Sequence, residues 1–187
     1  MKGVVFTEFQ EMIEDQFGLE MYDRLIQACD LSSHGAYTSV GTYDHSELLK
    51  LVTKLSSETG AEVPELVRAF GVHLFSRFSV AYPQFLEGIE TAIDFLRSVE
   101  DCIHVEVRKL YPDAELPKFT FEQIAESRWE MNYESSRPFA DLAHGLIAAT
   151  IEHFGDAIDL DRFDGPEASG MAARFVLTSR ERATACS

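Results

Sequence analysis

A phenol, a hydroxyl and a guanidinium recur at every second position of this chain, in Tyr133, Ser135 and Arg137. Trp129 and Met131 continue the same alternation toward the N-terminus. Alternate side chains of a β-strand share one face, so a strand here would be apolar at one end and rich in hydrogen-bond donors at the other. A guanidinium binds a carboxylate through two parallel hydrogen bonds, and the two hydroxyls add further donors. This face therefore suits a ligand with an apolar body and an anionic end.

A single histidine, His104, lies upstream of this motif in an apolar segment with helical periodicity, beside Ile103 and Val107. A buried neutral imidazole offers a nitrogen lone pair that a metal ion accepts. On these residues alone, two simpler interpretations stay open. His104 could be an ordinary core or surface histidine, and the Y-x-S-x-R motif could be a strand end that points into water, because short motifs often occur by chance.

Taken together, these residues resemble the haem-nitric oxide/oxygen binding (H-NOX) family, which is related to the haem domain of soluble guanylate cyclase. The family has a Met-x-Gly start, an axial histidine in a central helix, a proline near the haem and a Y-x-S-x-R motif. Residues 1–3, His104, Pro117 and residues 133–137 match these signatures, so the resemblance covers essentially the whole chain. It implies non-covalent haem b with His104 on the iron, Pro117 against the porphyrin and the Y-x-S-x-R side chains on the haem carboxylates. A proline that merely begins a strand is an equally good interpretation of Pro117.

The resemblance also implies an apolar pocket on the other side of the haem, lined by Val5, Phe9, Leu74, Phe78, Leu142 and Leu146. Family members that bind O₂ stably carry a tyrosine near the position of Leu142, which donates a hydrogen bond to O₂, and a polar partner near that of Leu74. Leucine has no donor, whereas NO binds ferrous iron strongly without one. The resemblance therefore implies a sensor that binds NO, with CO as a further ligand, and that binds O₂ poorly. Ordinary core packing is the alternative interpretation of these side chains.

The same resemblance implies a sensor without catalytic activity. Because the chain ends at residue 187, we expect a separate effector, either a histidine kinase or a cyclic-di-GMP enzyme (a diguanylate cyclase or phosphodiesterase). NO would weaken the Fe–His104 bond, release the helix that carries His104 and move one lobe against the other. The alternatives are a haem-dependent redox enzyme, an O₂ or CO sensor, and a haem-independent protein that binds another carboxylate or a phosphate. A peroxidase needs distal acid–base residues, which an apolar pocket does not supply.

The composition narrows the class of protein. With 32 acidic and 16 basic residues, the formal net charge is −16, which disfavours nucleic acid as a partner. No stretch approaches the roughly 20 apolar residues of a membrane span, and no signal peptide is present, so we expect a cytoplasmic protein. Three widely spaced cysteines disfavour a disulfide framework, and Cys102-Ile103-His104 is not the C-x-x-C-H motif of covalent haem attachment.

The hydrophobic periodicity predicts helices first and strands later. Apolar residues at helical spacing predict helices near residues 3–17, 19–29, 44–55, 64–78, 85–99 and 100–111, the third beginning with a capping box of Asp44 and Glu47. Alternation then predicts strands near 119–121, 128–137, 157–163 and 172–178, with a helix from Pro138 to Phe154. We expect an α+β fold with a single domain over residues 1–187: an N-terminal helical lobe (about 1–62), then a lobe with a small antiparallel sheet and a long helix (about 63–187), and haem between them.

Overall fold

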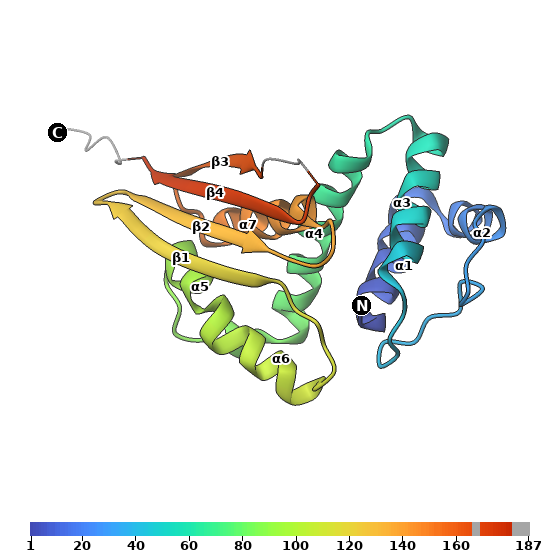
Figure 1. The fold of residues 1–187 in the computed structure, drawn as a ribbon, viewed down its shortest axis with the longest axis horizontal. Coiled ribbons are helices and arrows are strands. Elements are labelled where there is room, and N and C mark those ends of the chain that lie inside the picture. Colours follow the sequence, from blue (N-terminus) through green and yellow to red (C-terminus); the bar gives the residue numbers. More distant parts are fainter. Residues whose placement is uncertain (166–168, 181–187) are drawn as a thin grey trace.

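The structure is a computed structural model that describes residues 1–165 and 169–180. Helices α1, α2 and α3 lie on one side of the molecule and the β-sheet on the other, with α4 between them (Figure 1). The helices are α1 (Gly3–Phe17), α2 (Leu19–Ala28), α3 (His45–Thr59), α4 (Val63–Ala81), α5 (Ala92–Ser98), α6 (His104–Leu110) and α7 (Ala140–Phe154), with a 3-10 turn η1 (Pro83–Phe85) and a π-helical turn η2 (Val99–Ile103). Within the described residues, no helix is both long and apolar enough to cross a membrane.

The sheet has four antiparallel strands in the order β1-β2-β4-β3. The strands are β1 (Lys118–Ala125), β2 (Arg128–Glu134), β3 (Ile158–Asp164) and β4 (Ala172–Ser179). One face packs on α5 and α7 through Met131, Tyr133 and Phe175, all buried. The α+β prediction, with helices first and a small antiparallel sheet later, is confirmed.

Two apolar cores form in this arrangement. The first groups α1, α2, α3 and α4, with Phe6, Phe9, Leu51 and Phe70 at its centre. The second groups α5, α7 and the sheet. Helix α4 also packs along α7, so it joins the two cores.

The capping prediction for α3 is only half right. The Asp44 side chain accepts a hydrogen bond from the Ser46 backbone N–H at 2.8 Å, as an N-cap does. Glu47 does not complete a capping box. Its buried carboxylate accepts hydrogen bonds from the hydroxyls of Ser33 and Tyr37 and from the Ser33 backbone N–H, and this tertiary network replaces the local bond.

The helices before β1 differ from the prediction. The helix expected over residues 85–99 begins only at Ala92, because Gly88 adopts a left-handed φ of 76° and the Thr91 side chain caps the helix by accepting from the Asp94 backbone N–H. The expected break near residue 100 is absent. Helix α5 continues through η2 into α6, and such π-helical turns often occur at functional sites.

Strand β2 ends earlier than predicted. It stops at Glu134, so Ser135 and Arg137 lie in a turn that precedes α7. The Ser135 hydroxyl accepts a hydrogen bond from the Arg137 backbone N–H at 3.1 Å, while the Ser135 N–H donates to the carbonyl of Met171 at 2.8 Å. A serine hydroxyl that bonds to nearby backbone competes with the strand ladder, and this bond accounts for the early turn.

Candidate functional site

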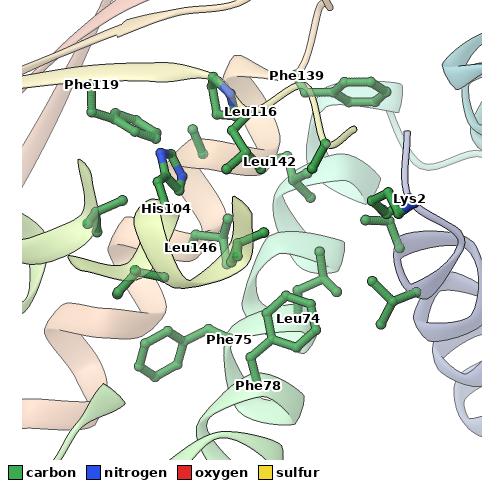
Figure 2. Close-up of a pocket in the computed structure, with 18 of the residues that line it drawn as sticks. Lys2, Leu74, Phe75, Phe78, His104, Leu116, Phe119, Phe139, Leu142 and Leu146 are labelled. Atoms are coloured by element: carbon green, nitrogen blue, oxygen red, sulfur yellow. The ribbon is translucent and has the colours of Figure 1, made fainter. Parts of the chain in front are cut away.

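A cavity of about 450 Å³ lies between α4, α6, α7 and the N-terminus. Figure 2 shows its wall, with His104 on one side, Lys2 on the opposite side and Leu74, Leu142 and Leu146 between them. The wall includes every site residue expected from the sequence except Phe9, namely Val5, Leu74, Phe78, His104, Pro117, Tyr133, Ser135, Arg137, Leu142 and Leu146. Residues far apart in the sequence therefore converge on one space of the size that small ligands and cofactors occupy.

Phe9 lies away from this space. Its side chain is fully buried in the core between α1 and α4, where its ring packs edge-on against Phe70 at a centroid distance of 5.1 Å. It can support the wall through α1, but it does not line the cavity.

His104 is the first residue of α6 and follows directly on the π-helical turn. It is 8% exposed, and its Nδ1 lies 3.0 Å from Oε2 of Glu100. Burial lowers the pKa of His104, and the Glu100 carboxylate opposes that shift, so the imidazole is neutral at pH 7. All six histidines fall within the described residues, and only His104 lines the cavity.

Glu100 contacts this imidazole and was not among the residues predicted for the site. Besides His104, its carboxylate accepts hydrogen bonds from the Arg108 guanidinium at 3.1 Å and from the Phe119 backbone N–H at 3.2 Å. Burial acts to raise the pKa of Glu100, but these three donors hold it below its ordinary value. The signal was present as spacing, because Glu100 and Arg108 stand four residues before and after His104, on the same helical face.

The polar end of the cavity is built by the turn after β2. The Arg137 guanidinium donates to the carbonyl oxygen of Glu115 at 2.9 Å and pairs with the exposed carboxylate of the same residue. The Tyr133 hydroxyl is buried and lies 3.4 Å from the Arg137 carbonyl oxygen. Burial raises the pKa of Tyr133, so the phenol keeps its proton and remains a donor. Tyr133, near the end of β2, thus meets Ser135 and Arg137 of the following turn, and the three do not share one strand face.

The rest of the wall is largely apolar. Leu74 and Phe78 from α4 and Leu142 and Leu146 from α7 face the interior (Figure 2) and carry no hydrogen-bond donor. The Thr150 hydroxyl also lines the cavity, but it donates to the Leu146 carbonyl oxygen at 2.8 Å. Two further hydroxyls are present at the α4 end, on Ser79, which donates to the Ser76 carbonyl oxygen, and on the half-buried Tyr82.

This donor set fits haem. The neutral imidazole of His104 has its Nδ1 engaged by Glu100, which leaves Nε2 as the nitrogen that can bind iron. The apolar wall suits the porphyrin, and the guanidinium and hydroxyls at the other end suit its carboxylates.

Comparison with known proteins decides the family. A sequence model of the haem-NO-binding family matches residues 2–162. The chain belongs to this family. Its fold also matches solved H-NOX proteins from bacteria: the Fe(II) unliganded H-NOX protein from K. algicida is 40% identical over 98% of both chains, with a TM-score of 0.91. The IWP-051-bound H-NOX from Shewanella woodyi, in the Fe(II)CO state, is 43% identical over 98% of this chain and 96% of that one, with a TM-score of 0.80.

Two more distant relatives match the chain, one by structure and one by sequence. An H-NOX protein from S. oneidensis in the Fe(II)NO ligation state is 22% identical and superposes with a TM-score of 0.88 over 96% of this chain and 99% of that one. Soluble guanylate cyclase 89Db of Drosophila melanogaster is 26% identical over 141 residues, which are 73% of this chain. The matched region is 20% of that cyclase. The protein is thus an H-NOX domain, of the haem-binding gas-sensor family, and H-NOX domains bind haem.

Proposed function

We propose that this H-NOX protein holds haem b non-covalently through His104 and senses NO in preference to O₂. The observation that carries the proposal is the neutral, buried His104 on one side of a cavity whose adjoining wall is formed by Leu74, Phe78, Leu142 and Leu146. His104 would hold the haem iron, and bound haem would supply the ferrous iron that binds NO and a bond to His104 that NO binding would weaken.

The selectivity follows from the leucine wall beside His104. Bound O₂ carries partial negative charge and is stabilised by a hydrogen-bond donor, whereas NO binds ferrous iron strongly without one. Leu74, Leu142 and Leu146 offer no hydrogen-bond donor to a gas bound in this cavity. CO also needs no donor, and the S. woodyi relative was solved with CO, which supports CO as a further ligand.

The chain also offers a route by which movement of His104 can reach the N-terminal helices. The segment between α6 and β1 is tied to the N-terminus, because Lys2 donates to both carboxylate oxygens of Asp113, at 3.1 and 3.2 Å. Thr42 donates to the same carboxylate at 3.1 Å, and the Lys2 ammonium lies 5.1 Å from the centre of the Tyr111 ring. If NO binding released His104 from the iron, a shift of α6 would be transmitted to the N-terminus through this contact.

We further propose that the protein has no catalytic activity of its own and signals to a separate effector, either a histidine kinase or a cyclic-di-GMP enzyme. The presence of two apolar cores supports a division into a helical lobe, about 1–62, and a lobe that carries His104 and the sheet, about 63–187, with α4 packed against both. Interfaces between two packed units can switch between discrete arrangements, which suits a protein that reports through its shape.

Purification with haem, followed by absorbance and gel filtration, tests the proposal. We expect a Soret band that elutes with the protein, a ferrous spectrum typical of five-coordinate histidine ligation, and a new spectrum with NO. In air, no persistent O₂ spectrum should appear. A protein that stays colourless after haem supplementation would overturn the haem assignment, and a long-lived O₂ spectrum would overturn the selectivity.

The Tyr82 phenol is the alternative source of a donor for O₂, since it lines the cavity at the end of α4. Tyr82→Phe separates the two explanations. If the wild type forms no persistent O₂ complex, the Tyr82 phenol does not stabilise bound O₂ and the leucine wall decides selectivity. If the wild type does form a long-lived O₂ complex, its loss in Tyr82→Phe would assign the stabilisation to Tyr82.

A further inference from the structure

We infer that Glu100 is a positioning residue that selects the tautomer of His104 and sets the strength of its bond to iron, with Arg108 acting against it. The inference rests on the proposed function, because it takes His104 as the iron ligand. On this inference, the Glu100 carboxylate adjusts how readily NO binding breaks the bond between His104 and iron. The geometry around Glu100 carries this assignment.

Both oxygens of the Glu100 carboxylate are engaged. Oε2 faces Nδ1 of His104 at 3.0 Å and the Phe119 backbone N–H at 3.2 Å, and Oε1 accepts from Arg108 at 3.1 Å. An ionised carboxylate only accepts hydrogen bonds. The proton of a neutral His104 must therefore lie on Nδ1, and Nε2 keeps its lone pair.

The carboxylate is also held in place from two sides. The Phe119 N–H belongs to β1, so Glu100 joins the helix that carries His104 to the sheet. The Phe119 ring lies against the imidazole at a centroid distance of 5.8 Å. The imidazole is therefore restrained in both tautomer and tilt before any ligand arrives, as a preorganised metal ligand should be.

The electronic effect follows from the same bonds. A carboxylate that accepts the Nδ1 proton makes the imidazole more electron-rich and a stronger iron ligand. Arg108 donates a hydrogen bond to the same carboxylate and so reduces the electron density that the carboxylate supplies to the imidazole. Glu100 should therefore make the Fe–His104 bond harder for NO to break, and Arg108 should make it easier.

The first test uses haem-free protein, so it does not depend on gas binding. In ¹⁵N NMR spectra, His104 of the wild type should be the Nδ1–H tautomer, and Glu100→Ala should lose this preference. Glu106→Ala is the matched control, because Glu106 is on α6 and pairs with Lys109 at 2.5 Å, away from His104. An unchanged tautomer in Glu100→Ala would overturn the inference.

The second test uses ferrous haem-loaded protein and the Fe–His stretching frequency in resonance Raman spectra. Glu100→Gln should lower this frequency and Arg108→Ala should raise it, whereas Glu106→Gln should leave it unchanged. A residue with only a structural role would not give opposite shifts in the two variants. Shifts of the same sign, or none, would overturn the inference.

The NO response gives the functional readout. In Glu100→Gln, the equilibrium for loss of the Fe–His104 bond on NO binding should shift toward loss by roughly tenfold or more, the scale on which outer-sphere partners alter metal sites. Arg108→Ala should shift it the other way. The two proposals fail differently: if His104 is not the iron ligand, no variant changes the Fe–His frequency, yet the haem-free tautomer still decides whether Glu100 positions His104.

Discussion

Gly71 of α4 and Gly145 of α7 meet where the two helices cross, and neither has room for a side chain. A Cβ on Gly71 would lie 2.4 Å from the Leu142 carbonyl oxygen and 2.9 Å from the Cα of Gly145. A Cβ on Gly145 would lie 2.1 Å from the Arg68 carbonyl oxygen. These atoms are backbone, so only a shift of a whole helix could relieve the overlap. The crossing therefore sets the separation of the two helices that supply the leucine wall.

We predict that Gly71→Ala destabilises the protein by about 1–3 kcal/mol, the usual cost of forcing a methyl group into a packed interior. It should also move Leu142 relative to Leu74 and so change the NO and CO spectra. Chemical denaturation and absorbance measure the two effects. Gly165→Ala is the control, because its Cβ would make only ordinary contacts, the nearest at 3.4 Å. Equal stability of the two variants would contradict the tight crossing.

His104→Gly should remove the protein ligand to iron while leaving the cavity in place. The Y-x-S-x-R turn can still hold the haem carboxylates, so some haem should remain, with an altered ferrous spectrum. Added imidazole should enter the vacated space and restore a five-coordinate spectrum. His73→Gly is a suitable control, because His73 does not line the cavity. If His104→Gly keeps the wild-type ferrous spectrum, another residue binds the iron.

Leu142→Tyr should add a hydrogen-bond donor to a wall that has none at this position. We expect it to raise O₂ affinity, measured as the lifetime of the ferrous O₂ complex in air, with little change in NO binding. The gain should increase when a second polar side chain replaces Leu74, since the two face the same space (Figure 2). Leu142→Met, which adds no strong donor, is the control. If Leu142→Met shows the same gain, cavity shape and not hydrogen bonding controls O₂ binding.

The sequence predicted the elements well where the signal is local. Residues 3–17 form α1 as expected, and the alternation of Trp129, Met131 and Tyr133 predicted the inward face of β2. Local sequence patterns gave wrong predictions where a side chain bonds to a residue distant in the sequence. Glu47 has the spacing of a capping residue but accepts a hydrogen bond from Ser33 instead. The residues next to Glu47 in the sequence do not predict this partner.

The candidate site was predictable in part. The resemblance to the H-NOX family predicted that His104 and Arg137 belong to one site, and both line the same cavity. The motif does not include Glu100, which contacts His104 from four residues upstream. It also gave no hint of Glu115 beside Arg137, because that contact depends on how the chain between α6 and β1 folds back.

His144 gives a prediction for the dependence of stability on pH. Burial lowers its pKa from the ordinary 6.5, and Arg68 and Arg162 lower it further. Between that lowered pKa and 6.5, His144 binds more protons in the unfolded chain than in the folded one. The contribution of His144 to the free energy of unfolding therefore falls as the pH drops through this window and is constant above it. In haem-loaded protein, His144→Asn should reduce this fall, whereas His34→Asn, at an exposed position, should not. An unchanged pH profile in His144→Asn would contradict the prediction.

Arg137 should matter for haem retention more than for the choice of gas. It is largely buried at the end of the cavity proposed to bind the haem carboxylates, in a protein with net charge −16. Its positive charge therefore offsets the repulsion that the acidic protein exerts on those carboxylates. A hydrogen bond to a charged group contributes about 1.5–3 kcal/mol, and each ~1.4 kcal/mol is a factor of ten. Arg137→Ala should therefore speed haem loss to apomyoglobin by roughly tenfold or more, and Arg137→Lys should recover only part of this, because an ammonium cannot bind a carboxylate as a fork.

Glu115→Ala removes the anionic partner of Arg137, whereas Arg137→Ala removes the cation. The Glu115 carboxylate pairs with the Arg137 guanidinium, where it competes with a haem carboxylate for the same donors. Its removal should leave haem loss unchanged or slow it, because Arg137 is then free to bind the haem alone. NO should still bind the haem that remains in every variant. If Arg137→Ala retains haem as firmly as the wild type, or if Glu115→Ala loses it as fast as Arg137→Ala, then the guanidinium does not hold the haem carboxylates, and the ion pair with Glu115 only stabilises the turn after β2.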